Sequence, residues 1–350
     1  MNGCKIVFFC LLFLLIGTAA HAKIVFSSER DGEVGKPSGG VRGIYVMDDD
    51  GSNLTLLTES KELKPYPKCW SPDGQQILFG QDRLPLNLMN ADGTHIQQLH
   101  PRTDANTTIL GGSFSPDGKS IVFSRDFVKN GKVKNTITVM DLATRAMKII
   151  AEEDAVNCRW SPNGKQIVFD KPSTVGGGGN TIWIMGADGQ NPRPLIPAPP
   201  KGEFFTHRSK PRWSPDGQQI VFRHYEYIYK PWPGLPGRAL IYHAHRYIIC
   251  DRDGRNIRKL RIPKDWEVYS LDWMDDGESI VFAARADMPI DEPIMPGFVW
   301  PPSYVYKYNI RTWEITQLTD DPGWDQTIDW ISDDVLPVSP QGKKSNVGCD

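Results

Sequence analysis

A ten-residue phrase recurs five times along this 350-residue chain, and its spacing limits the folds that the chain can adopt. Each copy begins with Trp or Phe, continues in its full form with Ser-Pro-Asp-Gly or Ser-Pro-Asn-Gly, and ends in an apolar run such as Ile-Val-Phe. The copies occupy residues 70–79, 114–123, 160–169, 213–222 and, in a weaker form, 273–282. Their first residues lie 44 to 60 positions apart, a period that indicates repeated structural units.

The local chemistry of the phrase predicts a β-hairpin. Proline fixes φ near about −65°, and the glycine supplies the positive φ that closes a tight turn. The Ile-Val-Phe run is β-branched and aromatic, as is typical of a buried strand. A second phrase, for example residues 44–51, adds a third strand, an Asp-Gly turn and a short fourth strand. Each repeat is therefore predicted to supply four short antiparallel strands.

Repeats of this length with four strands each are typical of β-propeller blades, so we predict an all-β, six-bladed β-propeller. The ends of the chain give the count, because residues 24–26 match the second strand of a blade and residues 328–330 match a first strand. We expect the C-terminal strand to complete the first blade, which closes the ring. The propeller then spans residues 23–331, and residues 332–350 are predicted to form a disordered tail.

The Trp-Ser-Pro-Asp-Gly repeats resemble those of TolB-like β-propellers, and the resemblance covers almost all of the chain after residue 22. That family includes the periplasmic TolB protein, which binds partner proteins at the cell envelope, propeller domains of prolyl peptidases, and a manganese-dependent oligogalacturonate lyase. The sequence departs from TolB in leaving no room for the α/β domain that precedes TolB's propeller. No hydrolase domain follows the repeats. The resemblance implies a fold more strongly than it implies a function.

The first residues have the pattern of a signal peptide. Lys5 precedes an eleven-residue apolar run, and Ala-His-Ala at residues 20–22 fits a cleavage site. The run is shorter than the ~20 residues that span a bilayer, so we expect no transmembrane segment. Residues 1–22 are therefore predicted to be removed, and the protein is expected to be periplasmic or secreted.

Composition limits the partners. The formal net charge of −2 argues against a nucleic-acid ligand, which requires a basic surface. Four of the six cysteines lie after residue 22, too few for a disulfide framework in a chain of this length. We interpret these four cysteines as buried or free thiols. We also expect the protein to be a monomer.

Long connections concentrate on one face of the predicted ring, where a rigid scaffold would present them. The most distinctive is residues 224–245, in which two alternating arms flank a Pro/Gly turn and predict a long hairpin in blade five. With Tyr229 opposite Leu240, His224 would face His245 and Glu226 would face His243. These four residues would then share one face, since side chains alternate along a strand. They could hold Mn²⁺ or Zn²⁺, or form an ordinary polar hairpin face without metal.

The long-loop face around blades four to six is the predicted binding surface, because Tyr, Trp and Arg dominate binding hot spots. Its candidate residues are His207, Arg208, His224, Tyr225, Glu226, Trp232, His243, His245, Trp300 and Tyr304. Basic residues at 208, 210, 212, 223 and 246 lie near the same blade and could attract a carboxylate ligand or form a salt-paired surface. We expect an exported, non-catalytic binding protein with a protein or glycan partner at the envelope. The alternative is a metal-dependent polysaccharide lyase of the oligogalacturonate type.

Overall fold

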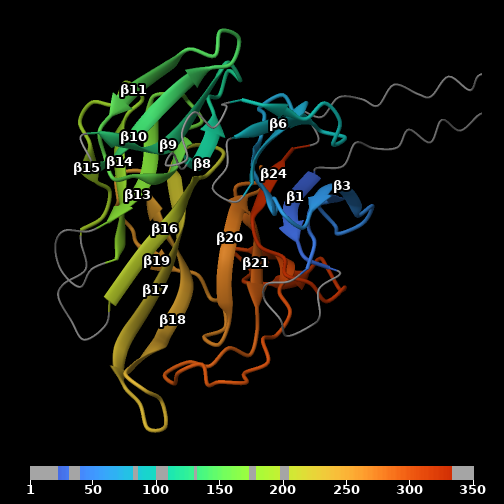
Figure 1. The fold of residues 1–350 in the computed structure, drawn as a ribbon, viewed down its shortest axis with the longest axis vertical. Coiled ribbons are helices and arrows are strands. Elements are labelled where there is room, and N and C mark those ends of the chain that lie inside the picture. The colour runs from blue at the N-terminus through green and yellow to red at the C-terminus, as the bar shows by residue number, and fades with distance from the viewer. Residues whose placement is uncertain are drawn as a thin grey trace, which may run out of the picture.

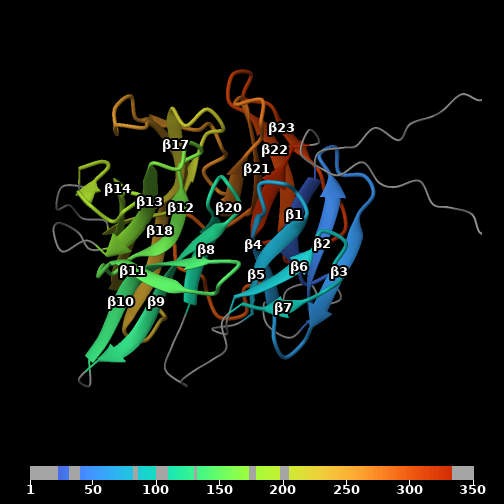
Figure 2. The same cartoon turned by 90° about the horizontal axis from the view of Figure 1, so that it is seen from above.

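The computed structural model describes residues 23–30, 40–81, 86–99, 109–129, 132–172, 179–197 and 205–332. These residues form six four-stranded antiparallel sheets grouped around a common centre (Figures 1 and 2). The prediction of a six-bladed β-propeller is confirmed. Within the described ranges, no helix is long and apolar enough to cross a membrane. The predicted signal peptide and nearly all of the predicted tail lie outside these residues.

Blade one joins the two ends of the propeller. Its strands, in spatial order, are β24 (Ile328–Ile331), β1 (Lys23–Ser28), β2 (Arg42–Asp48) and β3 (Thr55–Ser60). Strand β24 pairs antiparallel with β1, so that Ile24 lies opposite Trp330 and Phe26 lies opposite Ile328. The predicted ring closure is thereby confirmed.

Each of the other blades takes its four strands from one continuous stretch. Blade two contains β4 (Pro65–Trp70), β5 (Gln76–Gln81), β6 (Asn87–Asn90) and β7 (Gln97–Gln98), and blade three contains β8 (Ile109–Phe114), β9 (Ser120–Lys129), β10 (Lys132–Asp141) and β11 (Met147–Ala151). Blade four contains β12 (Val156–Trp160), β13 (Gln166–Pro172), β14 (Asn180–Gly186) and β15 (Arg193–Pro194). Blade five contains β16 (Phe205–Trp213), β17 (Gln219–Pro231), β18 (Arg238–Asp251) and β19 (Arg258–Lys259), and blade six contains β20 (Glu267–Trp273), β21 (Ser279–Arg285), β22 (Tyr304–Asn309) and β23 (Ile315–Gln317).

The repeated phrase forms the turn between the first and second strands of a blade. In blade two the Ser71 hydroxyl donates to Asp73 at 2.6 Å, and the Gly74 N–H donates to the Ser71 carbonyl at 2.9 Å. The Ser71 hydroxyl oxygen also accepts the Gln76 N–H at 2.9 Å. The turn satisfies its own polar groups, so it forms wherever the phrase occurs. The apolar run that follows ends in a fully buried phenylalanine in every blade, and these are Phe26, Phe79, Phe123, Phe169, Phe222 and Phe282.

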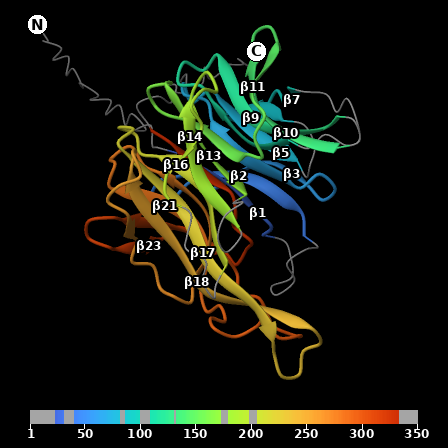
Figure 3. The same cartoon turned by 90° about the vertical axis from the view of Figure 1, so that its left-hand side faces the viewer.

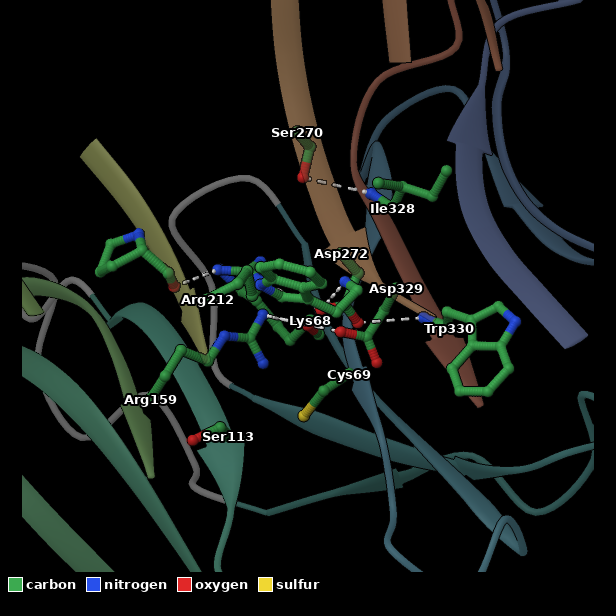
Figure 4. Close-up of polar contacts among 12 residues, drawn as sticks. Lys68, Cys69, Ser113, Arg159, Arg212, Ser270, Asp272, Ile328, Asp329 and Trp330 are labelled. Atoms are coloured by element: carbon green, nitrogen blue, oxygen red, sulfur yellow. Dashed lines mark hydrogen bonds and ion pairs between the residues drawn. The ribbon is translucent and has the colours of Figure 1, made fainter. Parts of the chain in front are cut away.

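Polar side chains join neighbouring first strands at the centre of the ring (Figure 4). The Asp329 carboxylate accepts the Trp70 N–H at 2.8 Å, and the Asp272 carboxylate accepts the Trp330 N–H at 3.1 Å. Each carboxylate belongs to the residue just before a repeat aromatic. These bonds link blades six, one and two in sequence around the ring.

Candidate functional site

The hairpin of β17 and β18 extends well past the other strands of the ring (Figures 1 and 3). Its two strands have 13 and 14 residues, and Tyr229 lies opposite Leu240, as expected from the sequence. The first strand of the blade, β16, pairs along its length with the part of β17 that lies nearest the ring. Blade five therefore presents a three-stranded surface that continues into a two-stranded tip.

A β-bulge changes the predicted pairing in the middle of this hairpin. Glu226 lies opposite Ala244, whereas the next residue, Tyr227, lies opposite Tyr242, so His243 is the extra residue of β18. Between the bulge and the body of the propeller, His224 lies opposite Arg246, and His245 lies opposite Tyr225. The predicted pairs His224–His245 and Glu226–His243 are therefore wrong, because one inserted residue reverses which side chains share a face.

The four proposed metal ligands do not come together. His224 Nε2 donates to Glu226 at 3.1 Å, and Arg246 lies 3.8 Å from the same carboxylate. The bond from His224, opposed by partial burial, lowers the pKa of Glu226 to about 2. His243 instead hydrogen-bonds to Asp291. Across the described part of the chain, no group of three or more His, Cys, Asp or Glu side chains could hold a metal ion.

The other face of the hairpin carries stacked aromatic rings. One cross-strand row is His207, Tyr225 and His245, whose neighbouring ring centroids are 4.6 and 5.8 Å apart. A second row begins with Phe205 stacked on Tyr227 at 5.5 Å and continues to Tyr242. We call this surface the aromatic face, and its members are Phe205, His207, Tyr225, Tyr227, Tyr229, Tyr242 and His245.

Two members of the aromatic face are open to solvent. Phe205 is 38% exposed and Tyr229 is 41% exposed. The histidines are more enclosed, and burial lowers the pKa of His207 to about 4 and of His245 to about 3, with Arg223 contributing in the same direction. Both imidazoles are consequently neutral near pH 7, so the face is aromatic and without charge of its own.

Arg223 fixes the base of the aromatic face to blade six. Its guanidinium lies 4.7 Å from the ring centroid of Tyr225 and donates to the carbonyl oxygens of Val268 and Tyr269 in β20, at 3.4 and 3.3 Å. An arginine that stacks on a ring and bonds to backbone at the same time holds both partners in one orientation.

A segment of blade six braces the hairpin from the side. Pro293 forms an isolated bridge with Ile241, and the Asp291 N–H donates to the Tyr242 carbonyl at 2.8 Å. The Asp291 carboxylate receives hydrogen bonds from His243 and, at 2.7 Å, from Lys264. The projecting strands are thus held to the next blade by backbone and side-chain contacts.

The ten predicted site residues fall into separate places. His207, Tyr225 and His245 lie on the aromatic face, while Arg208, His224 and Glu226 lie on the opposite face of the same sheet, since adjacent side chains alternate. His243 belongs to the brace. Trp232 lies in the hairpin turn beneath Lys230, whose ammonium is 5.6 Å from its ring.

The two predicted residues of blade six pack within that blade. Trp300 contacts Phe298 edge-on at 5.4 Å and lies 4.9 Å from the buried Arg285 guanidinium. Tyr304 packs edge-on against Tyr306 at 6.4 Å. Phe205, Tyr227, Tyr229 and Tyr242 were not predicted from the sequence. A signal was present for two of them, because Tyr225, Tyr227 and Tyr229 occupy alternate positions of one strand.

Comparisons with known proteins agree with this architecture. The family model for the TolB beta propeller domain matches residues 21–198. An uncharacterized protein of Agrobacterium fabrum, Atu1656, is 24% identical over 207 residues, which cover 53% of this chain and 63% of that protein. The chain thus spans less than two thirds of the length of this relative.

Solved structures share the fold at low sequence identity. TolB from Acinetobacter baumannii superposes with a TM-score of 0.61 at 18% identity, over 89% of this chain and 67% of that one. A putative TolB from Agrobacterium tumefaciens gives a TM-score of 0.55 at 16% identity, over 89% of this chain and 98% of that one. Likeness at this level concerns the fold and leaves the site to be argued from its own residues.

Proposed function

Because the chain belongs to the TolB beta propeller family, whose fold does not define an activity, we propose its function from the geometry of its own surface. It is a non-catalytic binding protein that docks a protein partner on the aromatic face of blade five. The observation that carries this proposal is a set of stacked rings held on a braced hairpin beyond the body of the propeller.

The physical case rests on rigidity and area. Tyrosine and phenylalanine offer large contact area at low cost in side-chain entropy, and they are frequent at binding hot spots. Here the rings are already ordered by stacking and by Arg223, so little conformational freedom is lost when a partner binds. The face is uncharged but is bordered by the Lys264–Asp291 pair, which provides a polar rim.

The site of action follows from the first residues of the chain. We propose that residues 1–22 direct export and are removed, so that the partner is met in the periplasm or outside the cell. N-terminal sequencing of protein recovered from the native host should begin at Lys23. Recovery of intact, unprocessed chain from the cytosol would contradict export.

The test of binding compares two changes at opposite ends of the same blade. The variant Phe205→Ser with Tyr229→Ser removes both exposed rings of the aromatic face, whereas Ile257→Ser alters a side chain that is 52% exposed after the Asp-Gly turn. Each protein is cross-linked in native envelope extracts, and the captured proteins are identified by mass spectrometry. We expect one protein to be retained by the parent and by Ile257→Ser, and its capture to fall at least tenfold, about 1.4 kcal/mol, in the double variant.

Two results would overturn the proposal. Equal capture by the parent and the double variant would remove the aromatic face from binding. Retention of a purified envelope polysaccharide by the aromatic face, with no protein captured, would replace the protein partner by a glycan. The lyase alternative has its own assay, since manganese-dependent cleavage of oligogalacturonate by the purified chain would show that the protein is an enzyme.

A further inference from the structure

The centre of the propeller contains a cavity of about 160 Å³ that is separate from the aromatic face. All six blades contribute to its wall, and every lining residue lies on a first strand or just before one. Its charged and polar lining residues include Lys68, Asn157, Arg159, Lys210, Arg212 and Ser270. They precede the repeat aromatics, so the cavity lies toward the face of the long connections.

Positive charge exceeds negative charge around this cavity. Arg159 lies 4.0 Å from Asp329, and Arg212 lies 3.9 Å from Asp272, so each arginine has one carboxylate nearby. Both carboxylates also accept backbone N–H groups. Burial and the neighbouring Asp272 raise the pKa of Asp329, so the two aspartates at most balance the two arginines. Lys68 and Lys210 are additional cations beside the cavity (Figure 4 shows Lys68 among the central side chains).

Neither lysine ammonium forms an ion pair with a carboxylate among the described residues. Among the residues that the structure describes, no hydrogen bond or ion pair reaches Lys68 Nζ or Lys210 Nζ, and the Lys68 ammonium lies 4.4 Å from the ring centroid of Tyr66. Asp170 accepts the backbone N–H of Lys210 at 3.1 Å, but it is also bonded by Asn157 and Asn180. Two cations on blades two and five are thus held beside the same cavity.

The surroundings of the cavity lower the pKa values of both lysines. Burial, together with Arg159, lowers the pKa of Lys68 to about 7. Burial, together with Arg223 and Arg212, lowers the pKa of Lys210 to about 7, although the Asp170 carboxylate acts in the opposite direction. An unpaired ammonium removed from water is costly, and an anion beside it would recover much of that cost. A carboxylate or phosphate group in this cavity would therefore stabilise the folded protein.

We propose that the central cavity binds a compact oxyanion, a carboxylate or phosphate group, between Lys68 and Lys210. The volume matches about five water molecules at roughly 30 Å³ each, which suits a phosphate or a small dicarboxylate and excludes a folded domain. Lysine binds such a group as a point charge, and the hydroxyl of Ser270 in the same wall can donate to it. The site is independent of the partner proposed for the aromatic face.

The experiment uses purified protein and two defined probes, inorganic phosphate and succinate, measured by calorimetry at constant ionic strength in chloride. The test variant is Lys68→Met with Lys210→Met, and the matched control is Lys148→Met on the exposed outer strand of blade three. We expect at least one probe to bind the parent and the control equally, and its affinity to fall at least tenfold in the double variant. Preference for phosphate or for succinate identifies which oxyanion the cavity takes.

The pH dependence provides a second readout. Succinate keeps its charge between about pH 7 and about pH 9, whereas lysines with pKa values near 7 lose theirs, so its affinity should weaken as pH rises over this range. The same lysines bind more protons in the unfolded chain than in the folded one between about pH 7 and their usual pKa of 10.5. The free energy of unfolding of the parent should therefore rise with pH over that window, and this rise should be smaller in the double variant.

The double variant also tests whether the two lysines are needed for folding. The double variant removes two unpaired cations, so it is expected to fold with a melting temperature at least equal to that of the parent. Binding that is unchanged in the double variant, or the absence of heat with both probes at millimolar concentration, would overturn the oxyanion site. Neither result would bear on capture of a protein by the aromatic face.

Discussion

The Asp-Gly turns between third and fourth strands pack directly against the preceding blade, and this contact gives a quantitative test of how the ring is assembled. A Cβ atom added at Gly254 in blade five would lie 1.9 Å from the carbonyl oxygen of Leu195 in blade four. The equivalent Cβ at Gly189 would lie 2.0 Å from the Ile150 carbonyl oxygen. The glycines are required both by their positive φ and by the closeness of the neighbouring chain.

The expected cost of Gly254→Ala has two parts. The φ of +85° is strained for alanine, which costs about 1–2 kcal/mol. Because real Cβ atoms essentially never come within 3.0 Å of another heavy atom, the turn or Leu195 must also move by about 1 Å. Disturbing a packed interface in this way costs roughly 1–3 kcal/mol more. The sum is about 2–5 kcal/mol, and each kcal/mol corresponds to a melting temperature lower by roughly 2–4 °C.

A matched control separates the two parts. Gly234 in the hairpin turn has a similar φ of +82°, but nothing lies within 4 Å of its added Cβ. Gly234→Ala should therefore show the strain alone, about 1–2 kcal/mol. Urea unfolding of the parent and both variants gives the two free energies. If Gly254→Ala proves no less stable than Gly234→Ala, the close approach between blades is not a constraint and the reasoning fails.

Two further predictions concern ring closure and the cysteine thiols. Ile328→Ala in β24 should lower the free energy of unfolding by about 2–4 kcal/mol, because Ile328 is 2% exposed and packs with Ile24 and Phe26. In the same urea titration the control Val299→Ala, at a side chain that is 70% exposed, should change this free energy by no more than about 0.5 kcal/mol, and equal effects of the two changes would contradict closure by β24. Burial raises the pKa of Cys69 to about 11 and of Cys158 and Cys250 to about 12. In a variant that lacks the other three cysteines, a thiol reagent at about pH 8 should therefore label the protein only as it unfolds, and rapid labelling of the folded protein would refute this.

The propeller could be predicted from the sequence because its determinants are local and repeated. Ser71, Asp73 and Gly74 close their turn through bonds within six residues, and equivalent bonds recur in the other three full copies of the phrase. The position of the turn then fixes which residues enter the core, so that Phe79 and its five equivalents are all buried. The closing pair of β1 and β24 followed from the unmatched half-repeats at the two ends.

The candidate site was harder to predict because one residue of slippage decides it. The alternation of Tyr225, Tyr227 and Tyr229 gives the composition of one face of β17 but not its partners on β18. The bulge at His243 changes those partners, and the residues around it do not predict a bulge. It removes His243 from the predicted metal set and places it against Asp291 in another blade. Contacts of that kind depend on how blades five and six meet.

The central charges had a signal that becomes clear only when the repeats are aligned on their aromatic residue. The residues just before that aromatic are, in ring order from blade two, Cys69, Ser113, Arg159, Arg212, Asp272 and Asp329. Two adjacent blades thus carry arginine and the next two carry aspartate, and their side chains meet at the centre (Figure 4). Asp329 arrives with the last strand, which pairs with β1 and places a carboxylate 4.0 Å from Arg159 on the opposite blade. Closure of the ring therefore also brings the second of two carboxylates to its two central arginines, beside the two lysines that we propose bind an oxyanion.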